Sequence, residues 1–134
     1  MKFLFILIIS TSLNALELST GASNASVYFI SPDDEESIAE KVIVRFGLEN
    51  FGVAPAGINM AQTGHHHLII DTNLPPLDQP IPADENHIHF GKGQTEIELK
   101  LSKGTHTLQL LLGDFRHIPH NPPIYSKRIT VQVN

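Results

Sequence analysis

The clearest hydrophobic pattern in the chain is an alternation between residues 94 and 101. Every second position there is apolar or β-branched, namely Thr95, Ile97, Leu99 and Leu101. Successive side chains of a strand point to opposite faces, so this pattern predicts a strand with one buried face. A turn follows at 102–104, and a second alternating segment at 105–112 has His106 and three leucines on one face. We therefore predict a hairpin.

Five further segments are rich in β-branched and aromatic residues and predict strands: 27–30, 41–48, 65–71, 87–90 and 129–133. Proline- and glycine-rich loops separate them, and helical periodicity is limited to one turn near 35–40. Short strands joined by such loops predict an all-β fold, an antiparallel sandwich of the immunoglobulin or fibronectin-III type with about seven strands.

The N-terminus predicts export. Lys2 precedes the apolar run 3–9, and small residues follow. This is the pattern of a secretory signal peptide over residues 1–15, cleaved after Ala15 or, as an alternative, after Ala25. Residues 26–134 are expected to form a single β-sandwich domain, in the periplasm rather than the outer medium. The apolar run is too short to span a membrane.

The composition of the chain limits which classes of binding partner are expected. The chain of 134 residues carries a formal charge of −5 and no cluster of Lys or Arg. Nucleic acids and anionic membranes both require a basic surface, so neither is expected as a partner. Cysteine is absent, which excludes disulfides and thiolate metal ligands. A periplasmic protein partner stays open, and the sequence does not indicate an oligomeric state.

Eight histidines provide the main chemical signal. Counting strand reversals predicts where they lie. If the strand ending at Leu48 finishes at one end of the sandwich, the next strand begins there with His65. Strand 94–101 then leaves that end and strand 105–112 returns to it. Seven histidines are thus expected near one end, and His106 at the other.

Two histidines at i and i+2 on a strand share a face, with Cα atoms ~6.6 Å apart, and two such imidazoles can bind one metal ion. His65 with His67 and His87 with His89 have this spacing. A loop adds His117 and His120, which are three residues apart. The predicted metal ligands are His65, His67, His87, His89, His117 and His120. Nitrogen ligands without thiolate favour copper or zinc as the cofactor.

Several nearby residues have alternative interpretations. His66 shares parity with Leu68 and Ile70, so it is either a core side chain or a ligand. His106 is expected to pack structurally. His117 and His120 also fit a role in bracing their proline-rich loop. Met60 is loop filler unless it adds a thioether ligand. Asp114 either orients an imidazole or caps a turn, and the turn role is the simpler one.

Some longer motifs resemble a known family. They span 53–57, 64–71, 74–83, 87–95 and 106–114, and the pattern His117-x-x-His120-x-Pro122-Pro123 follows them. Over about Val27 to Val133 the chain is similar to an uncharacterised bacterial family, the domain of unknown function 4399. The resemblance implies a small exported β domain in bacteria. It implies no activity, so no residue role follows from it.

Three functions fit these observations. The first is an exported metal-binding protein that captures or delivers copper or zinc. The second is an interaction module of the immunoglobulin type, whose histidines serve structure or respond to pH. The third, a small metalloenzyme, is disfavoured because no acidic residue stands beside the histidine pairs at the spacing of a general base.

Overall fold

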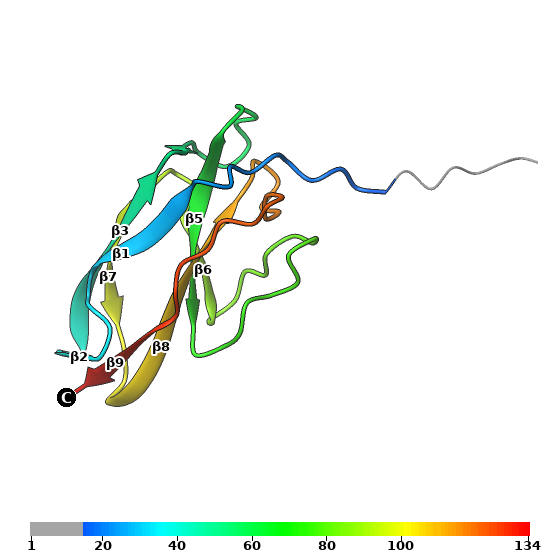
Figure 1. Cartoon of the computed structure of the whole chain (residues 1–134). Helices are drawn as coiled ribbons and strands as arrows, with labels where there is room; N and C mark the ends of the chain where they lie inside the picture. The colour runs from blue at the N-terminus through cyan, green and yellow to red at the C-terminus, as the bar shows by residue number, and fades with distance from the viewer. Residues whose placement is uncertain (1–14) are drawn as a thin grey trace, which may run out of the picture.

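Two β-sheets pack face to face in the computed structural model, which describes residues 15–134 (Figure 1). The first sheet contains β1 (Ser26–Ser31), β3 (Lys41–Glu49) and β7 (Glu96–Lys100), in the order β1-β3-β7, and both pairings are antiparallel. The predicted signal peptide falls almost wholly on residues 1–14, which lie outside the described part of the chain.

The second sheet has six strands. Its order is β2 (Glu36–Ile38), β9 (Ile129–Val133), β8 (Gly104–Gly113), β5 (Thr63–Ile70) and β4 (Gly52–Val53). The short β6 (His87–His89) pairs with β5 as well, on the edge that β8 leaves free. The pairs β2–β9 and β4–β5 are parallel, and the others are antiparallel. The predicted all-β sandwich is confirmed.

The structure corrects three details. The predicted hairpin of 94–101 with 105–112 is wrong, because β7 pairs with β3 while β8 pairs with β5 and β9 in the other sheet. The helical turn near 35–40 is wrong too, because residues 36–38 form β2. Nine strands are present in residues 15–134 instead of about seven, the additions being the short β2 and β4.

Strand β5 is buried on both faces. His66, Leu68 and Ile70 face the main core between the sheets, where Phe46 and Leu110 are also buried. On the outer face, Ile69 packs with Leu111 of β8 and with apolar side chains of the loop 72–86 (Leu74, Leu77 and Ile81). This loop stands over the outer side of the sheet (Figure 1). It gives β5 a second apolar layer.

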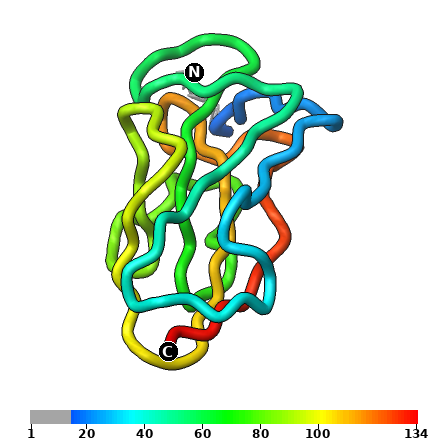
Figure 2. Tube along the Cα trace, turned by 90° about the vertical axis from the view of Figure 1, so that its left-hand side faces the viewer, coloured from blue at the N-terminus to red at the C-terminus, as the bar shows by residue number. Residues whose placement is uncertain are grey.

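Loops from distant parts of the sequence gather at the two ends of the sandwich. Figure 2 shows the loop 50–62 at one end, with the turn at 101–104 and the C-terminus at the other. The register His65↔Gly113 places the start of β5 beside the end of β8. The strand directions counted from the sequence are therefore correct, although some neighbours differ. No helix in residues 15–134 has the length and apolar character needed to cross a membrane.

Candidate metal centre

Two histidines of the central strand share its outer face. His65 and His67 occupy alternate positions of β5, their ring centroids are 4.7 Å apart, and both are buried. Strand β6 adds His89, which is the register partner of His67, with ring centroids 5.2 Å apart. The sheet therefore aligns three imidazoles, because paired residues of neighbouring strands point to the same side.

A tight loop contributes the fourth imidazole. His117 has a φ of 65°, a conformation that costs a non-glycine residue energy. Asp114 holds this loop, because its Oδ1 accepts hydrogen bonds from the backbone N–H groups of Arg116 and Ile118. The His117 N–H in turn donates to the Asp114 carbonyl oxygen at 2.8 Å. The turn role predicted for Asp114 agrees with this structure.

The four imidazoles converge at metal-ligand spacing. Nε2 of His65 lies 3.1 Å from Nδ1 of His117 and 3.2 Å from Nε2 of His89. One ring nitrogen from each of the four, His67 included, lies within 4.8 Å of the others. With metal–nitrogen bonds of ~2.0–2.1 Å, two ligand atoms of a tetrahedral ion are ~3.3 Å apart. The group needs only small shifts to surround one ion.

Two glycines make room for these rings. A Cβ built on Gly113 would lie 2.7 Å from Cε1 of His67, and one built on Gly91 would lie 2.2 Å from Cε1 of His89. Neither glycine has a positive φ. Glycine is needed here for space, and the sequence analysis missed both residues. The only sequence signal is their position, Gly91 two residues after His89 and Gly113 directly before Asp114.

Burial lowers the pKa of three of the four imidazoles. Desolvation, followed by repulsion from His89 and His117, lowers the pKa of His65 to about 4. Desolvation and the neighbouring imidazoles lower the pKa of His67 to about 2. The pKa of His89 is also lowered, first by burial and then by His117. A metal ion binds the unprotonated imidazole, so little proton competition is expected at neutral pH.

Buried ring nitrogens are left without partners. Nδ1 of His65 and Nδ1 of His67 have no hydrogen-bond partner. A buried polar atom without a partner costs free energy. His65 faces His89 and His117 with its Nε2, so its Nδ1 is not the atom that would bind an ion, and the case for a site depends on the convergence of the rings.

His87, one of the six predicted ligands, lies outside the group. It is on the same strand face as His89 but pairs with Ile69, near the far end of β5, so the expectation that it lies at the same end of the sandwich as His65 is wrong. Its Nδ1 lies 2.7 Å from Oδ1 of Asp84. The i, i+2 spacing thus predicted the shared face correctly. It did not show that only one member of the pair would reach the other imidazoles.

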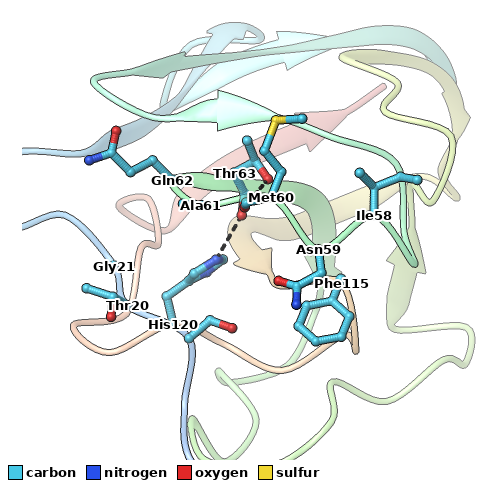
Figure 3. Close-up of a pocket in the computed structure, with 11 residues that line it drawn as sticks. Thr20, Gly21, Ile58, Asn59, Met60, Ala61, Gln62, Thr63, Phe115 and His120 are labelled. Carbon is cyan, nitrogen blue, oxygen red and sulfur yellow. Dashed lines mark hydrogen bonds between the residues drawn. The ribbon is translucent and has the colours of Figure 1, made fainter.

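His120, another predicted ligand, lies on the opposite face of β5. Its Nε2 donates to the Thr63 carbonyl oxygen at 3.0 Å, and its ring packs edge-on against Phe51. Gly64 permits this approach, since a Cβ there would lie 2.8 Å from Cε1 of His120. Figure 3 shows the imidazole hydrogen-bonded to residue 63, with Met60 extending away from it. These residues line a cavity of about 410 Å³. These contacts fit the alternative in which His120 braces its loop.

His66 is a core side chain, as one of its two interpretations held. Its ring packs edge-on against Phe46 at 5.0 Å, and neither ring nitrogen has a hydrogen-bond partner. Burial lowers its pKa to about 4. The side chain is therefore a neutral member of the hydrophobic core.

His106 forms a second constellation, at the other end of the sandwich. Its Nδ1 lies 2.6 Å from Oδ2 of Asp71, and its Nε2 lies 3.3 Å from Oγ of Ser102. Serine, histidine and aspartate contact one another in the same succession in hydrolase triads. Here, however, Nε2 is only 2.8 Å from the Ser102 carbonyl oxygen and donates to it. A nitrogen that donates cannot accept the serine proton. The constellation is structural, as predicted for His106.

The family comparison covers most of the chain. The model of the family described as "Domain of unknown function (DUF4399)" matches residues 44–134. The chain belongs to the DUF4399 family. Neither the curated proteins nor the solved structures include a match to the chain. The matched DUF4399 segment contains all four converging histidines and both glycines beside them.

Proposed function

We propose that this DUF4399 protein is an exported metal-binding protein that holds one copper or zinc ion through His65, His67, His89 and His117. The convergence of four ring nitrogens within 4.8 Å is the observation on which the proposal depends. The four residues come from three separate segments, and burying the polar ring nitrogens of His65 and His67 away from water costs free energy that a bound ion would offset.

The donor set favours copper or zinc. All four candidate donors are imidazole nitrogens, which suit Cu(II) and Zn(II) and are poor ligands for Ca²⁺ or Mg²⁺. Asp114 is buried nearby, but its carboxylate is occupied by Arg116, Ser19 and backbone N–H groups. It therefore contributes negative charge near the site and holds the His117 loop, and its oxygens are not free to bind an ion.

Export rests on the predicted signal peptide. Contacts of the first described residues support cleavage after Ala15 over cleavage after Ala25. Ser19 Oγ donates to Oδ2 of Asp114 at 2.7 Å, and the Gly21 N–H donates to the Asn121 carbonyl oxygen at 2.9 Å. Cleavage after Ala25 would remove these contacts with the loop that carries His117.

Metal content tests the proposal. The mature chain beginning at Leu16, produced without a histidine tag, is expected to carry about one equivalent of copper or zinc by elemental analysis. The double variant His67→Ala/His89→Ala is expected to lose the metal. His87→Ala is the matched control and is expected to keep it, since His87 contacts Asp84 instead.

Thermal unfolding gives a second measurement. An ion bound only by the folded state raises stability, by about 2.7 kcal/mol at a free concentration 100 times the Kd. Copper or zinc should therefore raise the Tm of the metal-free protein, and a chelator should reverse the change. A mature chain that gains neither metal nor stability with either ion contradicts the proposal. Equal loss of metal in His87→Ala and the double variant contradicts the assigned ligands.

A further inference from the structure

A cleft of about 180 Å³ lies directly beside the histidine site. His67, His89 and His117 line it, together with the residues 80–83 of the loop that covers the sheet. His65 is fully buried and does not line the cleft. Three of the four proposed ligands can therefore be approached from this side, while His65 is enclosed.

The wall of the cleft offers few hydrogen-bond donors. Pro80 and Pro82 have no N–H group, and the N–H of Ile81 already donates to the His117 carbonyl oxygen at 2.8 Å. None of the residues 80–83 has a charged or polar side chain. Apart from the imidazoles, the cleft is thus an apolar surface.

We propose that this cleft admits a small exogenous ligand to a coordination position of the bound metal. The inference rests on the proposed metal site and adds the ligand class. With few donors in the wall, a multiply charged oxyanion such as phosphate would lose hydration without compensation. The ligand is therefore a weakly hydrated neutral or singly charged molecule with a nitrogen or sulfur donor atom.

Size and coordination chemistry agree with this class. A water molecule occupies ~30 Å³ of liquid, so the cleft has space for a ligand of a few non-hydrogen atoms. An ion held by the four imidazoles could take a further ligand, since zinc can expand from four to five ligands and copper accepts more than four. Because His65 is enclosed, such a ligand would approach past His67, His89 and His117.

Azide and thiocyanate are suitable probes, and phosphate is the negative probe. The mature protein is loaded with one equivalent of Cu(II), checked by elemental analysis, and titrated with each anion while its electron paramagnetic resonance and charge-transfer absorption are recorded. We expect saturable spectral changes with azide and thiocyanate and none with phosphate. Ala83→Phe, which fills the cleft, should raise the azide concentration at half saturation at least ~10-fold while copper stays bound.

Ala39→Phe is the matched control, because Ala39 is exposed between β2 and β3, and it should behave as the unsubstituted protein. Failure to take up either copper or zinc would overturn both the proposed function and this inference. Copper uptake without an azide response would overturn the inference alone. Equal azide binding by Ala83→Phe and Ala39→Phe would show that azide does not reach the metal through the cleft. Phosphate binding as strong as azide binding would overturn the ligand class.

Discussion

Single residues decide whether the imidazoles can meet, and the glycines matter as much as the histidines. The ring of His67 occupies the space where a side chain at residue 113 would begin, and His89 occupies the equivalent space at residue 91. His65 and His67 are almost fully buried, so their rings have little space to move. A methyl group at either glycine therefore has to displace a proposed ligand.

Gly113→Ala should weaken metal binding while the protein stays folded. The new Cβ would lie 2.7 Å from the His67 ring, which has little space to move. Changes in the groups that orient ligands cost about 10- to 100-fold in metal affinity, and we expect a rise of that size in the Kd for copper or zinc, measured by competition with a chelator.

Gly57→Ala is the control for that substitution. Gly57 has a φ of 83° and open space around its Cα, so alanine there strains the backbone without touching the histidines. Its stability should fall by about 1 kcal/mol with unchanged metal affinity. An unchanged Kd in Gly113→Ala would show that His67 can move away or is not a ligand.

His66→Leu tests the core assignment of the middle histidine. Leucine has a similar volume and removes two buried nitrogens that lack partners, so the free energy of unfolding should stay the same or rise by about 1 kcal/mol. Metal content should not change. Leu68→Ala, on the same face of β5, should instead lose about 2–5 kcal/mol. Urea denaturation measures both, and a large loss in His66→Leu would assign His66 a polar partner.

At the scale of elements, β5 is the strand to consider first, because it carries both His65 and His67. It is hydrogen-bonded to β8 on one edge and to β4 and β6 on the other, so both His65 and His67 are held by neighbouring strands. At its far end, Asp71 fastens β5 to the start of β8. Its Oδ1 accepts from the Thr107 N–H at 2.9 Å while its Oδ2 pairs with His106.

The Asp71–His106 pair predicts a pH-dependent contribution to stability. The hydrogen bond with Asp71 raises the pKa of His106 above its ordinary value of 6.5. Since the folded pKa is higher than the unfolded one, the stabilisation is complete below about pH 6.5 and is lost as pH rises through the folded pKa.

Asp71→Asn isolates this contribution, because asparagine tolerates the φ of 56° at this position and keeps an oxygen for the Thr107 N–H. We expect it to cost about 0.5–1 kcal/mol at about pH 5.5 and less at about pH 8.5, measured by urea denaturation. A cost that is independent of pH would mean that the imidazole is not charged in the folded protein.

At the scale of the whole molecule, the site depends on segments that are distant in the sequence. The loop carrying His117 is fastened to the loop 72–86 through the Ile81–His117 hydrogen bond and to the N-terminal segment through Ser19 and Gly21. Arg116 adds a hydrogen bond from its guanidinium to the Glu17 carbonyl oxygen at 3.0 Å. The N-terminal segment therefore stabilises the position of one proposed ligand.

A chain that starts at Ser26 should bind metal more weakly than one that starts at Leu16. It lacks the Ser19, Gly21 and Glu17 contacts, and we expect about a 10-fold rise in the Kd, as for other losses of ligand-orienting groups. A chain that starts at Ser19 is the intermediate control. Mass spectrometry of the exported protein identifies the natural start, and equal affinity of all three chains would exclude a role for the segment.

The sequence by itself determined the strands and their directions. Alternating apolar positions reflect burial of one strand face, a local property, so the seven predicted strands were recovered and the start of β5 was correctly placed beside the end of β8. It also narrowed the candidate ligands to six histidines, four of which converge.

Only the tertiary structure decided which sheet each strand joined and which face each loop histidine reached. The turn after β7 leads into the other sheet, where long-range pairing with β5 and β9 replaces the expected hairpin. His120 lies on the core side of β5 because Gly64 leaves space there, and His87 lies too far along β6. The spacing of residues along the chain cannot show either fact, because both follow from contacts between residues 18 or more positions apart in the sequence.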